Sequence, residues 1–522
     1  MIRRWAVPGL ALVACFTGGW LAQERLGTGD NVYQQARLFE TVLAHVRDYH
    51  VDSLPESELY RRATDGLLDR LHDPYAALLV GKDYQRQQER TTGDYGGIGL
   101  QVDARNGWIT VIAPIPGTPA DRAGIRPGDQ LVEVDGSAAA GWPMDRAVQA
   151  MRGPLGTPID LAVRREGVDA PLRFRLVRER IHQRAVPEGI LLPEGVGYLS
   201  LTMIRENCAD ELAQEVARLV GQGMRSLVLD LRYDPGGLRD EAVRVADLFL
   251  DPRQDILVSR GRGPGDNHRW SDGAPQRWPG LPVVVLVNRG TASAAEIIAG
   301  ALQDHDRALV VGDTTYGKGI VQTLFPLAAD VALRITTARW YTPSGRSIQG
   351  ASLDSVMGAE HASADSTPYR SDAGRLLAGG GGIIPDVRLE PDTLSSEAQR
   401  FVRALDGRLP VFRDVLTAYA LELRRAGTVT SPRFVVNDGM RREVRRRLQI
   451  RGVSVPDSVY AGGAAIVNQQ LGYEIARYIF GASAERRRRV GEDPQVGEAV
   501  ALAERASTPA ALLGMVTDPT GH

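Results

Sequence analysis

The centre of the chain reads Val283-Val284-Val285-Leu286-Val287 and continues as Asn288-Arg289-Gly290-Thr291-Ala292-Ser293-Ala294-Ala295-Glu296. The first run consists of apolar β-formers, and the residues after Glu296 are apolar at helical spacing, so the pattern predicts a strand followed by a helix. Ser293 then lies in the turn between them. Its side chain would project from the carboxyl edge of a sheet, and the free N–H groups of the helix start could bind a negative oxygen beside it. A nucleophile would be useful at this position.

A serine hydroxyl needs a positioned base at neutral pH, and histidine does not supply one here. His305 is the histidine nearby in sequence, and it would lie roughly 18 Å from Ser293 along a continuous helix. A lysine can serve instead, because burial favours its neutral amine. The candidate is Lys318, whose glycine neighbours let the backbone pack closely. Gln322 would face the same side of an extended strand as Lys318 and could orient its amine.

Together these segments resemble the carboxyl-terminal processing proteases, the tail-specific proteases of peptidase family S41, which carry a Ser/Lys dyad and an embedded PDZ domain. The resemblance runs from about Leu38 to Val387. It implies that Ser293 is the nucleophile, that Lys318 takes its proton and that Gln322 positions the lysine. Ala295 departs from the family pattern, which usually has a second serine there, but the nucleophile position is filled.

A third segment of the family pattern appears as Leu229-Asp230-Leu231-Arg232-Tyr233-Asp234-Pro235-Gly236-Gly237. Asp234 stands where the family usually has asparagine. The resemblance implies that the glycine N–H groups of Gly236 and Gly237, with that of Ala294, form an oxyanion hole. The sequence does not say which glycine donates.

Each of these residues also has a structural interpretation. Ser293 could be an ordinary helix cap and Lys318 a surface charge. Asp230 and Arg232 could form an ordinary structural ion pair, and Glu296 and Asp304 could be solvated helix residues with only a supporting role. The joint occurrence of three segments in the right order favours the protease over these separate interpretations.

A nucleotide site is a further alternative, because residues 312–319 nearly match the phosphate-binding pattern G-x-x-x-x-G-K-[ST]. Gly319 replaces the hydroxyl residue that would hold magnesium. Val321 and the residues after it alternate like a strand, whereas the phosphate loop leads into a helix. We therefore expect no nucleotide, metal or other cofactor.

Composition indicates a protein of several domains with a substantial core. The chain has 522 residues, of which 43% are hydrophobic, and this length predicts three or four domains. Its net charge of -2 offers no general attraction to nucleic acid. Cys15 and Cys208 are its only cysteines, so a disulfide framework and a zinc-binding spacing are both excluded.

The amino terminus predicts export. Arg3 and Arg4 precede an apolar stretch that ends near Ala22, so residues 1–24 form a signal or anchor segment. Positive charges stay in the cytoplasm, which places the rest of the chain in the bacterial periplasm or cell envelope, attached to the inner membrane. An uncleaved anchor, a cleaved signal and a lipoprotein processed at Cys15 all remain open.

Residues 25–92 are predicted to be helical, because Leu38 begins a series of apolar residues at helical spacing. Residues 93–180 resemble a bacterial PDZ domain, since they contain the string Ala-Gly-Ile-Arg-Pro-Gly-Asp at 123–129. PDZ domains add a peptide strand to a sheet edge and capture the terminal carboxylate with backbone N–H groups. The resemblance places that carboxylate loop at Gly97-Ile98-Gly99-Leu100.

Strand-like and helix-like segments alternate over residues 181–394, which predicts an α/β protease core. Within it, residues 351–382 are rich in small and polar residues and are predicted to be a flexible insertion. Residues 395–522 are predicted to form a helical extension of unknown role. Its arginine clusters could touch acidic lipid or a partner, although a solvated helix face is the simpler interpretation.

The sequence thus predicts a multidomain α/β protein that acts as an exported serine endopeptidase. It would bind protein or peptide substrates that end in an exposed apolar carboxyl terminus. The alternative is a catalytically silent PDZ scaffold that only binds such tails. The natural substrate is not defined by the sequence, and a homo-oligomer is left open.

Overall fold

The structure is a computed structural model, and it describes residues 32–263, 265–350, 368–390 and 393–517. The predicted leader 1–24, with Cys15, and residues 351–367 of the predicted insertion lie outside these ranges. The chain forms two compact units, one of residues up to Leu79 with Leu324–Ile335 and one of Val80–Thr323 with Thr336–His522. Among the described residues, no helix has the length and apolar character that crossing a membrane requires.

The smaller unit is helical, as the spacing from Leu38 predicts. Helix α2 (Val32–Tyr49) has no buried side chain, whereas α3 (Glu56–Arg70) buries two leucines. The carbonyl of Tyr75, which follows α3, accepts a hydrogen bond from Arg334 Nε at 3.0 Å. The far end of a long β-hairpin, described below, therefore belongs to this unit.

Residues 94–182 form a small β domain in the larger unit, consistent with the predicted PDZ domain. It begins and ends in two antiparallel strands, β2 (Asp94–Gly97) and β9 (Glu179–His182). Its main sheet has the strand order β3-β4-β5-β7-β8, with β6 beside β5, so β3 has a free edge at which a peptide strand can pair. After α4 (Lys82–Thr92), which precedes this domain, the elements are β3 (Leu100–Arg105), β4 (Trp108–Pro114), α5 (Pro119–Arg122), β5 (Gln130–Val134), β6 (Ser137–Ala138), α6 (Met144–Met151), β7 (Pro158–Arg164) and β8 (Leu172–Val177).

A six-stranded sheet forms the centre of the predicted protease core, in the order β10-β11-β12-β15-β16-β21. β10 is antiparallel to its neighbour and the other strands are parallel. The carboxyl ends of parallel strands meet at one edge, so the loops that follow β12 and β15 lie side by side. The strands are β10 (Ile190–Leu191), β11 (Val196–Ser200), β12 (Ser226–Asp230), β15 (Val283–Val287), β16 (Leu309–Gly312) and β21 (Val387–Arg388).

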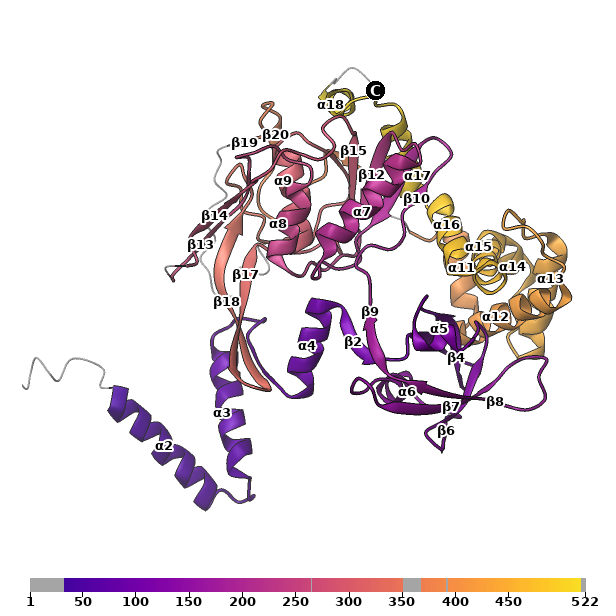
Figure 1. Cartoon of the computed structure of the whole chain (residues 1–522), viewed down its shortest axis with the longest axis horizontal. Helices are drawn as coiled ribbons and strands as arrows, with labels where there is room; N and C mark the ends of the chain where they lie inside the picture. The colour runs from indigo at the N-terminus through magenta and orange to yellow at the C-terminus, as the bar shows by residue number, and fades with distance from the viewer. Residues whose placement is uncertain (1–31, 264, 351–367, 391–392, 518–522) are drawn as a thin grey trace, which may run out of the picture. The chain divides into compact units, whose positions relative to one another are not determined.

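Helices cover both faces of this sheet (Figure 1). On one face lie α7 (Cys208–Gly221), α8 (Arg239–Asp247) and α9 (Ala294–Asp304), whose apolar side chains share a buried cluster with the sheet. The opposite face packs against α17 (Pro494–Glu504), near the carboxyl end of the chain. Burial on two faces explains why β15 is apolar throughout and β12 is apolar at its three central positions.

A second sheet contains a long hairpin that begins just after Lys318. Its strands pair in the order β1-β18-β13-β14, with β17 on β18. A separate pair, β19 with β20, lies in the described part of the predicted insertion. The strands are β1 (Ala77–Val80), β13 (Asp255–Gly261), β14 (His268–Ser271), β17 (Ile320–Ala328), β18 (Val331–Tyr341), β19 (Tyr369–Arg370) and β20 (Leu376–Leu377).

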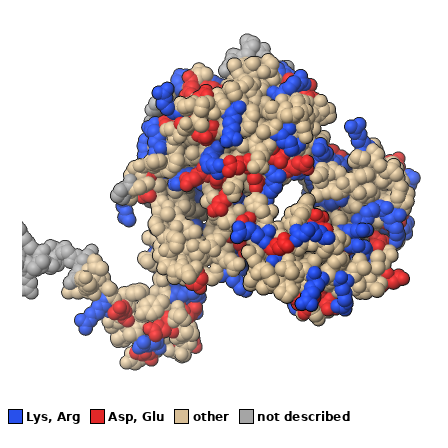
Figure 2. Space-filling view, in the orientation of Figure 1, with Lys and Arg blue, Asp and Glu red and all other residues tan. Residues whose placement is uncertain are grey.

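The carboxyl-terminal extension is helical, as predicted, and its first part has an apolar core of its own. Many of its arginines pair with carboxylates on the same or a neighbouring helix, and blue and red atoms lie close together there in Figure 2. This pairing favours the solvated-face interpretation of the arginine clusters. The helices are α11 (Ser396–Ala404), α12 (Leu409–Ala426), α13 (Asp438–Ile450), α14 (Asp457–Gly462), α15 (Ala464–Ile475), η1 (Ala476–Phe480), α16 (Ala482–Glu492), α17 and α18 (Pro509–Thr517).

Candidate active site

Ser293 lies in the turn between β15 and the first residue of α9, where the sequence predicts it. Its backbone has φ 55° and ψ −117°, a conformation that costs free energy for a residue with a side chain. Every residue of α9 is buried, whereas Ser293 itself is partly exposed. The turn thus presents the hydroxyl-bearing residue at the surface of a rigid, buried helix.

The carboxylate of Glu296 holds this turn to the loop that carries Lys318. Its Oε2 accepts the main-chain N–H of Ser293 at 2.6 Å and that of Lys318 at 2.9 Å. Its Oε1 accepts the N–H of Gly317 at 2.7 Å and the hydroxyl of Thr315 at 2.5 Å. Burial raises the pKa of the Glu296 carboxyl above its ordinary value, while these four hydrogen bonds oppose the shift.

The expectation that Glu296 is a solvated helix residue is therefore wrong, because its side chain is fully buried. A carboxylate with four donors is one of the few arrangements in which a buried charge is well compensated. The signal was present in the sequence: serine followed three residues later by glutamate is the capping-box pattern, in which the glutamate reaches back to the first residue.

Lys318 and Gln322 are in direct contact. Lys318 Nζ donates a hydrogen bond to Gln322 Oε1 at 2.8 Å. Lys318 lies just before β17 rather than in it, so the contact joins a loop residue to the third residue of the strand. The carbonyl of Lys318 also accepts a hydrogen bond from the indole of Trp340 at 3.1 Å. A strand follows Gly319 instead of a helix, which excludes the phosphate-loop interpretation.

The loop after β12 packs directly against the serine turn. The carbonyl of Asp234 accepts the N–H of Ala292 at 2.9 Å. Gly236 has φ 87°, and a Cβ there would lie 2.6 Å from the carbonyl oxygen of Ala292, so only glycine fits. This loop, residues 234–238, is called the oxyanion loop below.

The two predicted glycine donors differ in this loop. The N–H of Gly236 already donates to Asp234 Oδ1 at 2.8 Å. Among the described residues, no hydrogen bond is formed by the N–H group of Gly237 or by that of Ala294. Gly237 is thus better suited than Gly236 to share an oxyanion with Ala294, a choice that the sequence leaves open.

Asp230 and Arg232 form the ion pair that their spacing suggests, with Arg232 Nη2 at 2.7 Å from Asp230 Oδ2. Arg232 Nη2 is also 2.7 Å from Asp493 Oδ2, at the start of α17. Tyr198 donates its hydroxyl to Asp230 at 2.7 Å. The carboxyl-terminal extension therefore completes a largely buried charge network at Arg232, two residues before the oxyanion loop, which nothing in the sequence indicates.

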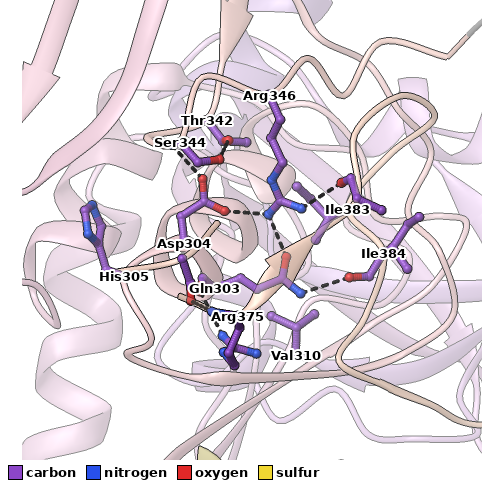
Figure 3. A network of polar contacts seen from close by, with 12 residues as sticks. Gln303, Asp304, His305, Val310, Thr342, Ser344, Arg346, Arg375, Ile383 and Ile384 are labelled. Carbon is purple, nitrogen blue, oxygen red and sulfur yellow. Dashed lines mark hydrogen bonds and ion pairs between the residues drawn. The ribbon is translucent and has the colours of Figure 1, made fainter. Parts of the chain in front are cut away.

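A second buried network fixes the other end of α9 (Figure 3). Arg346 is almost fully buried and forms an ion pair with Asp304 at 2.6 Å, while it also donates to Gln303 Oε1 at 2.6 Å. Asp304 Oδ2 accepts the N–H of Ser344 at 2.9 Å. The expectation that Asp304 is solvated is wrong, since its side chain is buried against these partners.

His305 lies at the carboxyl end of α9, at the opposite end of the helix from Ser293. Its Nδ1 is 2.8 Å from Asp372 Oδ2, and its Nε2 is 2.6 Å from the carbonyl oxygen of Asp255. Both ring nitrogens are thus occupied by structural contacts. This placement agrees with the expectation that His305 is not the base for Ser293.

A pocket of about 240 Å³ lies in the small β domain, between the edge strand β3 and helix α6. The four residues that the sequence predicts for carboxylate binding, Gly97 to Leu100, all line it. Arg152 lies at the pocket with its guanidinium over the ring of Tyr95, at 4.3 Å from the ring centroid. The pocket combines apolar side chains with the guanidinium of Arg152, which is also ion-paired with Glu89 at 2.5 Å.

Comparisons with known protein families assign the small β domain and the α/β core to two families. Residues 195–356 match the model of peptidase family S41, and residues 110–165 match the model of the PDZ domain. A carboxy-terminal-processing protease of Bartonella bacilliformis is 40% identical over 325 residues, which are 61% of this chain and 74% of the relative. A probable CtpA-like serine protease of Staphylococcus haemolyticus is 34% identical over 293 residues, which are 56% of this chain and 58% of the relative.

Among solved structures, the photosystem II D1 C-terminal processing protease is similar with 26% sequence identity and a TM-score of 0.35, covering 68% of this chain and 88% of that protein. The PDZ match at residues 110–165 precedes the peptidase match at residues 195–356, and this order agrees with the fold, in which helices come before the PDZ domain and after the protease core. The chain belongs to peptidase family S41, the carboxyl-terminal processing proteases, and is a serine-type peptidase with an embedded PDZ domain.

Proposed function

We propose that the protein is an exported endopeptidase that binds the carboxyl-terminal tails of proteins through its PDZ domain and cleaves them with a dyad of Ser293 and Lys318. The observation that carries this proposal is the shared carboxylate of Glu296. One oxygen of that carboxylate binds the main chain of both Ser293 and Lys318. A contact of this kind fixes the distance between a nucleophile and its base before substrate arrives.

In the proposed reaction, the Ser293 hydroxyl attacks the carbonyl carbon of the scissile bond while Lys318 takes its proton. Gln322 accepts a hydrogen bond from the Lys318 amine and so aims it. The N–H groups of Gly237 and Ala294 stabilise the oxyanion that develops on the carbonyl oxygen. Lys318 then gives the proton to the leaving amine, which leaves the acyl group bound to Ser293. Water attacks this acyl group while Lys318 takes a proton from the water, and Lys318 returns the proton to Ser293 as the acid is released.

The choice of residue for positive charge supports a special role for Lys318. Of the 62 lysine and arginine residues, only Lys82 and Lys318 are lysines. Arginine stays protonated in proteins and cannot act as a base, whereas a lysine amine can lose its proton. A chain that otherwise uses arginine keeps a lysine at the position where a neutral amine is needed.

The two lysines give a matched test of the dyad. We expect Ser293→Ala and Lys318→Ala each to abolish cleavage of a peptide with a free apolar end, and Lys82→Ala to leave it unchanged. With ¹⁵N-labelled lysine, a fluorophosphonate at Ser293 should shift the side-chain signal of Lys318 and not that of Lys82. Full activity in Lys318→Ala would exclude the dyad, and a protein unreactive toward both probes would favour a silent scaffold.

Tail recognition rests on the pocket between β3 and α6. A peptide strand paired with β3 would bring its terminal carboxylate toward Gly97 to Leu100 and its last apolar side chain toward Val148 and Met151. We expect a free apolar carboxyl end to bind and to be cut better than its amidated copy. Equal cleavage of both copies would show that the pocket does not select the substrate.

Export is proposed from the sequence of residues 1–24. We expect a reporter enzyme fused after residue 31 to be active outside the cytoplasm and inactive when Arg3 to Ala22 is deleted. If Cys15 is lipidated, Cys15→Ser blocks processing, and unchanged mobility would favour an uncleaved anchor. A fusion active only in the cytoplasm would contradict the proposal.

A further inference from the structure

One short segment contacts both the oxyanion loop and the chain that enters and leaves the PDZ domain. This bridge segment consists of residues 204–206. On one side, the N–H of Ile204 donates to the carbonyl of Gly236 at 3.1 Å, and the carbonyl of Ile204 accepts the N–H of Leu238 at 2.9 Å. These two bonds enclose Gly237, so the bridge segment sets the position of the predicted oxyanion donor.

On its other side, the bridge segment holds both connections to the PDZ domain. The N–H of Glu206 donates to the carbonyl of Thr91 at 3.0 Å, just before β2. Arg205 Nη1 donates to the carbonyl of Gln183 at 2.9 Å, just after β9. Gln183 itself lines the tail pocket, so a chain of contacts runs from the pocket through Arg205 to the oxyanion loop.

The charge of Arg205 acts on a second buried group, the carboxyl of Asp234. Both side chains are buried, Arg205 at 9% exposure and Asp234 at 0%. Arg205 donates a hydrogen bond to the carbonyl of Gln183, and Asp234 accepts one from the N–H of Gly236. Arg205 Nε and Asp234 Oδ2 have no hydrogen-bond partner among the described residues. The charge of each group shifts the pKa of the other, but the two groups do not form an ion pair.

The charges around the pair come from three neighbouring elements. Burial raises the pKa of Asp234 to about 7, while the Gly236 N–H and Arg205 lower it. Burial lowers the pKa of Arg205, while Glu211 of α7 and Asp234 raise it. Cys208, at the start of α7, is also close to Asp234, and Glu241 of α8 faces the same cysteine.

We propose that Arg205 and Asp234 are a pair of positioning residues, in which Arg205, held to the chain that leaves the PDZ domain, sets the charge that Asp234 places beside the oxyanion site. The inference rests on the proposed function of Ser293 and Gly237. In this arrangement the ionised carboxylate of Asp234 opposes the negative charge that develops at the neighbouring oxyanion, and the guanidinium of Arg205 offsets it. Protonated Asp234 keeps its hydrogen bond from Gly236 without that charge.

The first experiment compares the wild-type chain with Asp234→Asn, which retains an oxygen that can accept the Gly236 N–H. The rate of fluorophosphonate labelling at Ser293 is measured from pH 5.5 to 9, because this small probe uses the oxyanion site without needing a peptide tail. We expect equal rates at pH 5.5 and a rate about tenfold higher for Asp234→Asn at pH 9. The ratio of the two rates then reports the titration of Asp234.

The second experiment repeats this ratio in an Arg205→Gln background. Loss of the guanidinium removes a charge that favours the carboxylate, so the inflection of the ratio should move to higher pH. Arg205→Lys keeps the charge and should leave the inflection in place. Arg307→Gln is the matched control, because Arg307 is equally buried and donates to the carbonyls of Phe249, Leu281 and Trp278, away from the oxyanion loop.

Each outcome decides the proposal. A ratio that stays flat across the pH range would show that Asp234 does not act on the site. An inflection that Arg205→Gln leaves unmoved, or that Arg307→Gln moves equally, would show that the two residues are not a pair. If Arg205→Gln does not fold, Arg205→Lys with and without Asp234→Asn still tests the titration. Failure of the proposed function appears separately, as a wild-type chain that the probe does not label at Ser293.

Discussion

Glu296 Oε2 accepts the main-chain N–H of Lys318 at 2.9 Å, and this contact joins the loop of the proposed base to the helix that starts beside the proposed nucleophile. The same oxygen accepts the N–H of Ser293. A buried carboxylate that binds the main chain of both residues thus sets the relative position of the two catalytic candidates. Their positions then depend on a residue that does no chemistry.

Replacing Glu296 by glutamine tests this dependence. The amide nitrogen would face main-chain N–H groups where an acceptor is required, so at least one buried donor loses its partner. We expect Glu296→Gln to lower kcat about 10- to 100-fold and to reduce the free energy of unfolding by roughly 1–3 kcal/mol. Glu474→Gln is a control, because Glu474 is also buried and accepts from Thr417, within the carboxyl-terminal helices. It should lower stability without changing kcat, and an equal fall in kcat in both variants would contradict the positioning role.

The contact between Lys318 and Gln322 predicts opposite pH behaviour for two substitutions. Gln322→Leu removes the acceptor and should reduce kcat about tenfold at every pH, with KM little changed. Gln322→Glu places a carboxylate beside the amine and favours its charged form, which cannot take a proton. We expect its activity to be low at neutral pH and to recover as the pH rises. Steady-state rates between pH 6 and 10 measure both effects, and parallel profiles for the two variants would be incompatible with the amine as base.

The ion pair of Asp304 and Arg346 should contribute to stability only as an intact pair. Arg346→Met leaves the Asp304 carboxylate buried without its cation, which costs roughly 3–5 kcal/mol of unfolding free energy. In the double variant Asp304→Leu with Arg346→Met, no unpaired charge remains, so we expect part of that loss to be recovered. Urea unfolding of the wild type, of Asp304→Leu, of Arg346→Met and of the double variant gives the coupling. Additive losses in the double variant would show that the two side chains do not act together.

Much of the architecture could be predicted from the sequence, because local patterns determine it. The apolar run from Val283 and the helical spacing after Glu296 place Ser293 in its turn. The glycines around Lys318 and the short spacing to Gln322 indicate a contact that the structure contains. The loop at Gly97 lines a pocket beside β3, and the binding of a peptide carboxylate there stays a prediction.

The remaining features depend on residues far apart in sequence, for which a single chain carries no local signal. Arg232 meets Asp493 across 261 positions. Arg346 buries the charge of Asp304, which alone looks like a solvated helix residue. Nothing in the composition of the carboxyl-terminal extension indicates that α17 covers the second face of the central sheet. These contacts arise from packing of the whole molecule, so pattern and spacing could not reveal them.

His182 links the strand that leaves the PDZ domain to both a neighbouring strand and the protease core. Its Nδ1 is 2.8 Å from Asp94 Oδ1 in β2, and its Nε2 is 2.7 Å from Glu211 Oε1 in α7. Arg180 and Arg184 lie near the far sides of these carboxylates, at 3.9 Å and 3.8 Å. The hydrogen bond to Glu211, followed by the one to Asp94, raises the pKa of His182 above 6.5, although partial burial opposes the shift.

A histidine whose pKa is higher in the folded state stabilises the fold when it is protonated. Its contribution is fully present below pH 6.5 and is lost as the pH rises through the raised pKa. We therefore expect His182→Gln to lower the free energy of unfolding most at pH 5.5, and progressively less toward pH 8.5. In a Glu211→Gln background the same substitution should show a weaker pH dependence, because the larger cause of the shift is gone. Urea titrations of the four proteins at several pH values measure this cycle, and a loss that is the same at every pH would mean that His182 stabilises the fold by packing and not by its charge.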